Sequence, residues 1–506
     1  MQSATATATS PSRFAWSDLR IPVAVALVRI LLHLATDGRY GFHRDELQTV
    51  DDARYLAWGY VAYPPLTPFV ARVAFELFGA SLTGLRFFAA LGQGVALVLI
   101  GLLVRDLGGK RTAQLAAALG VAIAPLSLSA GTLFQYVSFD YLWWVLTAYF
   151  MVRLLRTENP RWWLGIGAAI GLGMLTKYTV LFLVAGMAAG VLLTPARRYL
   201  RSPWLWCGAV LAVLIFLPNL IWQFQHDFIS LDFLRSIHER DVRIGRTKGF
   251  LVEQLYVPAN PFTIPMWLTG LYYVFTRRAR RYRPFGWMFI TALALFLVAQ
   301  GRSYYMAPAY PALLAAGAVF WEQRLAAMTP AQARWRKALR WTALTAGAVL
   351  AIVLVVQITP INSPLWNISD DRKEEIGWPE LVQAVAGVRD GLPAEDRKRL
   401  GVLTGNYGEA GAIDLYGPPY SLPRAISGVN SYWLRGYGDP PPETVIAVGL
   451  SRRSLDRVFE SCELAGHVTN RYNVKNEETT SHPDIFLCRR PRQPWPELWK
   501  QARAFG

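Results

Sequence analysis

Eleven apolar segments of 15 to 20 residues, separated by short charged breaks, make up most of the first 357 residues. A helix that crosses a bilayer needs roughly 20 predominantly apolar residues. Because 53% of the chain is hydrophobic and it contains 19 Trp, we expect a mostly α, polytopic membrane helix bundle of about 11 spans. The expected spans are residues 21–36, 85–104, 113–129, 139–155, 162–176, 179–194, 203–222, 262–276, 285–299, 305–322 and 339–357.

The formal net charge of +17 would suggest a nucleic-acid partner in a soluble protein. Here the Lys and Arg residues cluster in alternate short loops between apolar segments, as orientation signals do, so we expect no nucleic-acid partner. By the positive-inside rule these loops are cytoplasmic, which places the N-terminus inside and the chain after residue 357 outside. The basic loops are residues 105–111, 153–161, 197–201, 277–283 and 324–340.

The character of the sequence changes after residue 357, where hydropathy falls and turns rich in Pro and Gly appear. The runs 444–448 and 484–487 predict strands, and the stretches 378–388 and 453–460 predict amphipathic helices. A soluble α/β domain on the outer face is therefore expected. The predicted parts are a cytoplasmic N-terminal segment 1–20 with a disordered start through Ser17, a membrane domain 21–357 with a first outer loop 37–84, and the outer domain 358–506.

Two of the three cysteines, Cys462 and Cys488, lie in the expected outer domain. Outside a bacterial-type plasma membrane, thiols can be oxidised, so the pair could form a disulfide. The spacing alone leaves the bonded and the reduced states open.

The first apolar segment carries Arg29 and His33, which are four residues apart and share one helical face. Two interpretations stay open. The pair is either buried against neighbouring helices or in contact with a lipid phosphate.

An acidic pair, Asp45-Glu46, follows His43-Arg44 in the first outer loop. A carboxylate partly shielded from water at a membrane surface can have its pKa raised toward working pH, as a general base for a hydroxyl group requires. The alternative is a capped surface helix with ordinary solvated charges.

Further polar groups are expected on the same side of the membrane. Tyr63 lies in the aromatic, proline-rich run 58–68, which precedes an amphipathic segment suited to the membrane interface. Asp140, Lys177 and Arg302 lie at the outer ends of later spans, so acids and bases converge on one face. Each has a structural alternative, which is a helix N-cap for Asp140 and a snorkelling side chain for Lys177 and Arg302.

The order of these motifs resembles the C-type glycosyltransferases that use polyprenyl-phosphate sugars. Within them the chain is similar to bacterial relatives of protein O-mannosyltransferases and lipid A aminoarabinose transferases. The resemblance covers nearly the whole chain. It rests on the His-Arg-Asp-Glu loop, Tyr63-Pro64-Pro65-Leu66, the Asp140 loop, Leu175–Thr179, Arg302–Pro311, Asn406–Ala410 and Ser427–Trp433.

The resemblance implies site residues only where motifs match. Asp45 is similar to the family's first-loop aspartate, the general base, with Glu46 beside it, and Asp140 is similar to a second acid. Arg302 and Tyr305 resemble the turn that meets the donor phosphate.

The remaining matches concern a metal, the donor and the acceptor. His238 resembles an element that helps some members hold a divalent metal. Some relatives have Glu-Lys where this chain has Ala62-Tyr63, so metal binding is left open. Lys177 is a second candidate for the donor phosphate, while Tyr63, Asn406 and Glu409 are acceptor-binding or structural candidates.

We therefore expect a multi-pass glycosyltransferase of the cell inner (plasma) membrane, with membrane lipid as a partner. It would transfer a hexosyl or pentosyl group from a polyprenyl-phosphate donor to a glycolipid, glycan or protein acceptor at the outer face. The alternative is a multi-span transporter or flippase of an anionic lipid-linked substrate. Such proteins tend to carry ionisable groups at mid-membrane and paired halves, whereas the acids here lie at the outer ends of spans.

Overall fold

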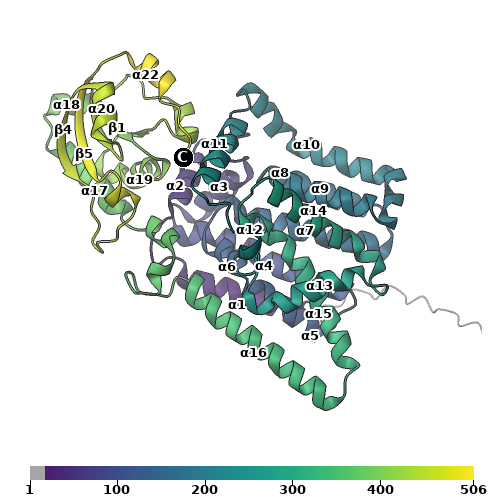
Figure 1. The fold of residues 1–506 in the computed structure, drawn as a ribbon. Coiled ribbons are helices and arrows are strands. Elements are labelled where there is room, and N and C mark those ends of the chain that lie inside the picture. Colours follow the sequence, from purple (N-terminus) through teal and green to yellow (C-terminus); the bar gives the residue numbers. More distant parts are fainter. Residues whose placement is uncertain (1–17) are drawn as a thin grey trace, which may run out of the picture.

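The computed structural model describes residues 18–506 as a long helical body joined to a smaller α/β domain (Figure 1). The expected disordered start through Ser17 lies outside the described residues. The helices of the body are α1 (Arg20–Thr36), α2 (Arg44–Asp52), α3 (Leu66–Phe78), α4 (Leu82–Asp106), α5 (Arg111–Ala122), α6 (Pro125–Thr132), α7 (Tyr136–Thr157), α8 (Trp162–Met174), α9 (Val180–Leu192), α10 (Pro203–Gln225), α11 (Ile229–Arg243), α12 (Phe250–Glu253), α13 (Ile264–Phe275), α14 (Arg283–Val298), α15 (Tyr310–Ala326) and α16 (Pro330–Val355).

Every apolar segment predicted as a span falls on helical structure, but not every one is a single straight helix. The segment 113–129 is divided into α5 and α6, which meet at 66°. The break precedes Pro125, which lacks a backbone N–H and cannot continue the hydrogen-bond ladder of α5. The mostly helical fold class is confirmed.

Three of the described helices, α4, α10 and α16, are long and apolar enough to cross a membrane. The number rises to five if α5–α6 and the bent pair of α9 with the 3₁₀ helix η2 (Pro195–Arg201) each form one span. The full number of about eleven spans stays a prediction.

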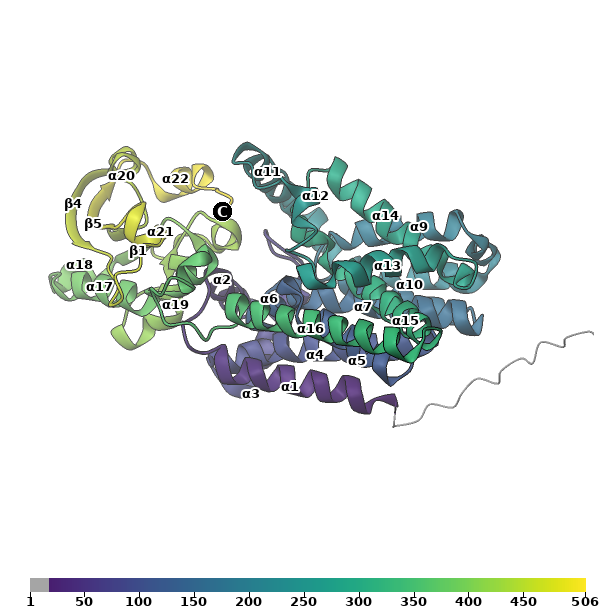
Figure 2. The same cartoon turned by 60° about the horizontal axis from the view of Figure 1, so that its bottom comes forward.

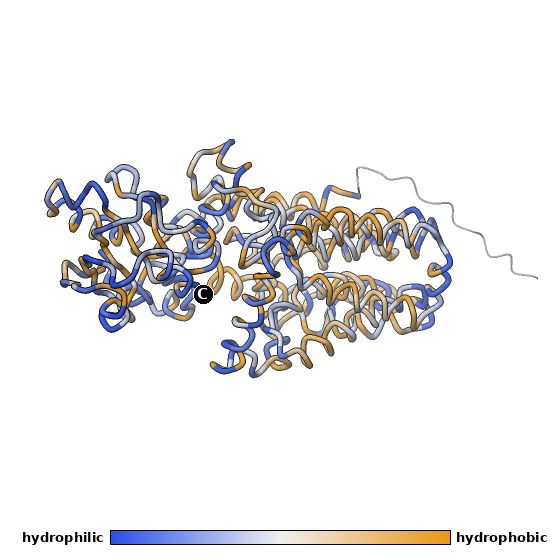
Figure 3. Tube along the Cα trace, turned by 90° about the horizontal axis from the view of Figure 1, so that it is seen from above, coloured by the Kyte–Doolittle hydropathy of each residue, from blue (hydrophilic) through white to orange (hydrophobic). Residues whose placement is uncertain are grey.

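The long helices differ in what covers them. The most apolar window of α4 is 67% buried, whereas those of α10 and α16 are only 11% and 17% buried. Apolar side chains such as Trp206 and Val349 are therefore exposed on the outside of the bundle. The helices of the bundle are mostly orange, and the turns at its far end are blue (Figure 3). Exposed apolar side chains along the helices are what a bundle in contact with lipid requires.

Glycines let neighbouring helices of the bundle approach closely. A Cβ added at Gly270 of α13 would lie 1.9 Å from the carbonyl oxygen of Leu313 on α15. One added at Gly317 of α15 would lie 1.9 Å from the carbonyl oxygen of Met266. Packing through small residues is typical of helix pairs in membranes.

The basic loops gather at the end of the body far from the α/β domain. The buried carboxylate of Asp106, at the end of α4, accepts a hydrogen bond from Arg153 of α7 at 3.1 Å and another from Arg156. The Tyr282 hydroxyl donates to the Asp106 backbone carbonyl at 3.2 Å. The start of α1 lies at the same end (Figure 2). The predicted grouping of these loops is confirmed, while their cytoplasmic location stays a prediction.

Arg29 and His33 are buried between helices. The Arg29 guanidinium donates to the Ser127 hydroxyl at 2.9 Å, and His33 Nδ1 pairs with Asp37 at 2.8 Å. The structural interpretation of this pair is confirmed.

The α/β domain after α16 contains a five-stranded sheet in the order β2-β1-β3-β5-β4. The pairs β1–β2 and β1–β3 are parallel, and β3–β5 and β4–β5 are antiparallel. Both predicted strands are present, as β3 and the start of β5. The predicted helix 453–460 ends at Val458, where β4 begins. The elements are α17 (Trp378–Asp390), α18 (Ala394–Lys398), β1 (Leu400–Thr404), α19 (Tyr407–Tyr416), β2 (Ala425–Ile426), β3 (Thr444–Val448), α20 (Arg452–Val458), β4 (Phe459–His467), α21 (Glu477–Thr480), β5 (Asp484–Pro491) and α22 (Trp495–Gln501).

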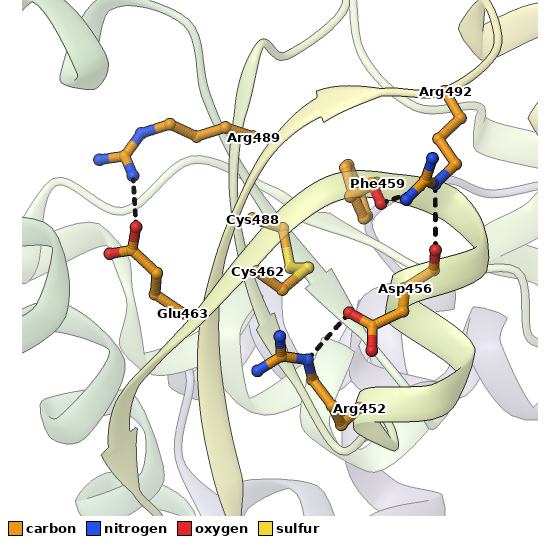
Figure 4. The surroundings of a disulfide bond; sticks show 8 residues. All are labelled: Arg452, Asp456, Phe459, Cys462, Glu463, Cys488, Arg489 and Arg492. Carbon is orange, nitrogen blue, oxygen red and sulfur yellow. Dashed lines mark hydrogen bonds and ion pairs between the residues drawn. A yellow bond between two sulfur atoms is a disulfide. The ribbon is translucent and has the colours of Figure 1, made fainter.

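Cys462 and Cys488 form a disulfide in this sheet (Figure 4). They are directly opposite each other on the antiparallel strands β4 and β5. The cross-link therefore joins the edge strand β4 to the strand beside it.

Loss of the disulfide by Cys462→Ser should lower the free energy of unfolding of this domain by about 2–4 kcal/mol, because the cross-link restricts the unfolded chain. Thermal unfolding of the purified protein measures the effect. Cys207→Ser is the matched control, since Cys207 is free and exposed on α10. A thiol titration of the unfolded, unreduced protein that finds all three cysteines reactive would contradict the bond.

Candidate active site

The first outer loop folds into α2, whose start is fixed by a capping box. His43 is the N-cap, and its Nδ1 accepts from the Asp45 N–H at 3.2 Å. The Glu46 carboxylate accepts from the His43 N–H at 2.8 Å. The capped helix that sequence allowed as an alternative is therefore present. Its acids are not simply solvated, because Glu46, Asp51 and Asp52 are buried.

Glu46 points into the protein and is fully buried. Arg86 of α4 donates to both of its carboxylate oxygens, at 2.8 and 2.7 Å. The Phe134 N–H also donates to this carboxylate, at 2.8 Å. Because Glu46 is fully buried and paired with Arg86, a substrate hydroxyl cannot reach it, so its geometry favours a structural role over the catalytic role expected from sequence.

Asp45 points the other way and keeps 38% of its side chain exposed. Its Oδ1 accepts from the hydroxyl of Tyr407 at 2.7 Å, and its Oδ2 accepts from Gln135 Nε2 at 3.1 Å. Tyr407 begins α19 and Gln135 precedes α7. Three elements that are distant in sequence thus surround one accessible carboxylate.

Lys177 lies between α8 and α9 in a box of aromatic rings. Its Nζ is 4.1 Å from the ring centroid of Tyr305, 5.0 Å from that of Tyr136 and 5.1 Å from that of Tyr304. Such contacts attract a cation to the ring faces. Burial lowers the pKa of Lys177 to about 8, and Asp140 opposes the shift. The ammonium group is thus close to titration at neutral pH.

Asp140 is buried in α7 near this lysine. The N-cap of α7 is Gln135, so the N-cap alternative for Asp140 is wrong. Its Oδ1 has no hydrogen-bond partner among the described residues. The clearest role for this carboxylate is to favour the charged form of Lys177 by electrostatic attraction.

Arg302 forms a bidentate pair with Asp241 of α11. Its Nε donates to Asp241 Oδ2 at 2.6 Å, and its Nη2 donates to Oδ1 at 2.9 Å. This pair orients the guanidinium at the start of the 3₁₀ helix η5 (Ser303–Ala309), which carries two of the aromatic rings around Lys177. Arg302 and Lys177 are close enough for their charges to interact.

Tyr136 joins the two halves of the site. Its ring lies 5.0 Å from Lys177 Nζ, and the residue before it, Gln135, donates to Asp45. The charges of Asp45 and Arg302 both act on its hydroxyl. The structure therefore places an exposed carboxylate and two cations in one region around Tyr136. The predicted residues Asp45, Asp140, Lys177, Arg302 and Tyr305 lie in this region, and their roles stay predictions.

The predicted residues Tyr63, Asn406 and Glu409 make structural contacts. Tyr63 is buried, donates to Asp52 at 2.5 Å and packs its ring 6.1 Å from that of Tyr136. Asn406 and Glu409 form the capping box of α19, so they have the structural role that sequence left open. Burial and the neighbouring Glu478 raise the pKa of Glu409 to about 8.

His238 is exposed on α11. Across residues 18–506, no group of three or more His, Cys, Asp or Glu side chains could hold a metal ion. The described residues therefore offer no donor set made of three such side chains for the divalent metal that the resemblance left open.

Sequence reasoning assigned no role to Gln135, Tyr136, Tyr407 or Asp241. Gln135 and Tyr136 directly precede the Asp140 turn, and Tyr407 lies in the motif 406–410. Their proximity to those motifs was the only feature of the sequence that could have indicated a role in the site. Asp241 carried no signal of its own, because its partner Arg302 is 61 residues away.

Comparisons with known proteins agree with this architecture. A family model described as dolichyl-phosphate-mannose-protein mannosyltransferase matches residues 62–222. The lipid A galacturonosyltransferase RgtD of Rhizobium johnstonii is 32% identical over 215 residues, which are 40% of this chain. The aligned region spans only 44% of that relative's length.

Solved structures show the same fold over nearly the whole chain. ArnT from Cupriavidus metallidurans bound to undecaprenyl phosphate superposes with a TM-score of 0.58 at 17% identity, covering 94% of this chain and 98% of that one. The apo form of that ArnT gives 0.56 at 16% identity, covering 92% and 97%. Together the comparisons confirm the resemblance to C-type, polyprenyl-phosphate-sugar-dependent membrane glycosyltransferases.

Replacement of Glu46 by Ala should destabilise the protein by about 3–5 kcal/mol, because Arg86 would be left as a buried charge with one partner fewer. Thermal unfolding measures this loss. The control is Glu395→Ala, which removes an exposed ion pair with Lys398 and should cost less than about 1 kcal/mol. Equal melting temperatures for the two variants would contradict the structural role of Glu46.

Proposed function

We propose that this protein is an integral membrane glycosyltransferase that moves a sugar from a polyprenyl-phosphate donor to an acceptor hydroxyl. The observation that carries the proposal is the shared site around Tyr136. There the accessible carboxylate of Asp45 and the cations Lys177 and Arg302 all lie near Tyr136. A base for the acceptor and cations for an anionic leaving group are the two requirements of this reaction.

The proposed reaction exchanges one bond at the anomeric carbon. The acceptor oxygen forms a bond to that carbon as the bond to the phosphate oxygen breaks. Asp45 takes the proton of the acceptor hydroxyl, and polyprenyl phosphate leaves with the bonding electron pair. Lys177 and Arg302 stabilise the negative charge that grows on the phosphate. Attack from the side opposite the leaving group inverts the anomeric centre.

The names of the relatives support the substrate classes. The ArnT structure contains undecaprenyl phosphate, which supports a polyprenyl monophosphate carrier here. RgtD is named for lipid A, which supports a glycolipid acceptor over a glycan or protein one. The transferred group would be a hexosyl or pentosyl unit.

The proposed location is the plasma membrane, with the N-terminus in the cytoplasm and residues 358–506 outside. The basic loops around Asp106 support this orientation through the positive-inside rule. The site would then open on the outer side, where the α/β domain lies over α2. No comparison favours the transporter or flippase alternative.

Asp45→Asn should slow sugar transfer by roughly 10²–10⁴-fold, because the amide cannot accept the hydroxyl proton. The assay is release of polyprenyl phosphate from a sugar-loaded lipid by purified protein without any gradient. Thermal unfolding confirms that the variant folds.

The control is Asp370→Asn, which changes an exposed carboxylate on the 3₁₀ helix η7 (Asp370–Glu375) and should retain full activity. Full activity of Asp45→Asn would remove the assignment of the base. Absence of any polyprenyl phosphate release by the unaltered protein would favour the flippase alternative.

Binding of polyprenyl phosphate should weaken as pH rises above about 8. The lowered pKa of Lys177 means that its ammonium loses its proton in that range, whereas an ordinary lysine stays charged. The phosphate itself is fully ionised above pH 7.5, since its second pKa is about 6, so it contributes no change there.

The measurement is the affinity for polyprenyl phosphate in detergent between pH 7.5 and about 9.5. Lys177→Arg should flatten the pH dependence, because a guanidinium stays charged throughout. A pH-independent affinity in the unaltered protein would contradict the role of Lys177.

A further inference from the structure

Helix α19 of the outer domain packs directly on α2, which carries Asp45. A Cβ added at Gly411 would lie 2.7 Å from the Cβ of Leu47, and one added at Gly408 would lie 2.9 Å from the Cβ of Arg44. Only side chains as small as hydrogen fit at these two positions. The contact is therefore close and is defined by the backbones of both helices.

Polar contacts also join α2 to a second element of the outer domain, the 3₁₀ helix η9 (Asn430–Arg435). Asn430 Nδ2 donates to Gln48 Oε1 at 2.9 Å, in a buried contact. Arg435 of the outer domain pairs with both Asp51 and Asp52 at the end of α2. Buried, charge-assisted bonds of this kind define one orientation between the parts that they join.

Tyr407 is the first residue of α19, and the fold determines its direction. The capping box of Asn406 and Glu409 sets where the helix begins. The guanidinium of Arg44 lies over the Tyr407 ring, 4.9 Å from its centroid. The hydroxyl then reaches the Oδ1 of Asp45 at 2.7 Å.

This hydroxyl acts as a hydrogen-bond donor throughout the working pH range. Burial, together with the nearby charge of Asp45, raises the pKa of Tyr407 well above its usual value of 10.0. The phenol therefore does not ionise near neutral pH. A donor held against a carboxylate favours the ionised carboxylate over the acid.

We propose that the outer domain supplies a positioning residue, Tyr407, for the base Asp45. Tyr407 holds one carboxylate oxygen while Gln135 holds the other, so the rotation of the carboxylate is set from two separate elements. The outer domain thus completes the proposed catalytic site. This inference rests on the proposed function.

The test is Tyr407→Phe, which removes only the hydroxyl. We expect kcat to fall on the order of tenfold, with KM for the donor within about twofold, because one charge-assisted hydrogen bond to the base is lost. A merely structural role would instead leave both constants unchanged or worsen kcat and KM together.

Tyr420→Phe is the matched control. Tyr420 lies in the same domain, is 37% exposed and follows the C-terminus of α19, so its loss of a hydroxyl should change neither kcat nor KM. A Tyr407→Phe variant with the kcat and KM of the unaltered protein would overturn the inference. So would a variant whose KM for the donor rises as much as its kcat falls.

A double-mutant cycle in thermal unfolding separates this inference from the proposed function. The losses of Tm in Tyr407→Phe and Asp45→Ala should not add in the double variant, because both remove the same hydrogen bond. Additive losses would overturn the contact itself. Full activity of Asp45→Asn would instead overturn the proposed base while leaving non-additive losses of Tm intact.

Discussion

The rest of the site depends on the hydrogen bonds that the buried guanidinium of Arg86 donates. From α4 it donates to Glu46 at the start of α2, to Glu375 in the segment that leads into the outer domain, and to the backbone carbonyls of Asp37 and Gly41. A buried charge is tolerated only when several partners compensate for its lost hydration. Because these partners come from the first loop and from the segment before α17, the requirement ties both of them to α4 of the bundle.

Because Arg86 holds Glu46 at the start of α2, the direction of the neighbouring Asp45 is also fixed. Consecutive residues of a helix point about 100° apart, so a helix held by Glu46 presents Asp45 in a different direction. One carboxylate of the pair is used for structure, and its neighbour stays accessible beside Tyr136. Two chemically similar adjacent residues therefore differ in role only because of what lies around them.

Hydropathy predicted where the helices lie, since apolar segments must be covered by lipid or protein whatever their neighbours are. The span 203–222 lies within α10, and the strand 444–448 coincides with β3. The loops that bear Asp45, Lys177 and Arg302 were also predictable as one group, because alternate loops of a bundle share one end. What hydropathy could not predict were long-range pairs such as Arg302 with Asp241, or Asp45 with Tyr407. One sequence contains no information on which distant polar groups meet.

The sequence by itself determined the helical bundle, the appended α/β domain and the end of the bundle at which ionisable groups collect. These follow from local composition and from the alternation of basic loops, which depend little on partners. Tertiary structure alone decided that Glu46 is buried against Arg86, that Cys462 and Cys488 are bonded, and that the outer domain reaches Asp45 through Tyr407. The physical reason is that burial and hydrogen bonding of a polar group depend on the neighbours that folding brings to it, and these neighbours lie up to 384 residues away.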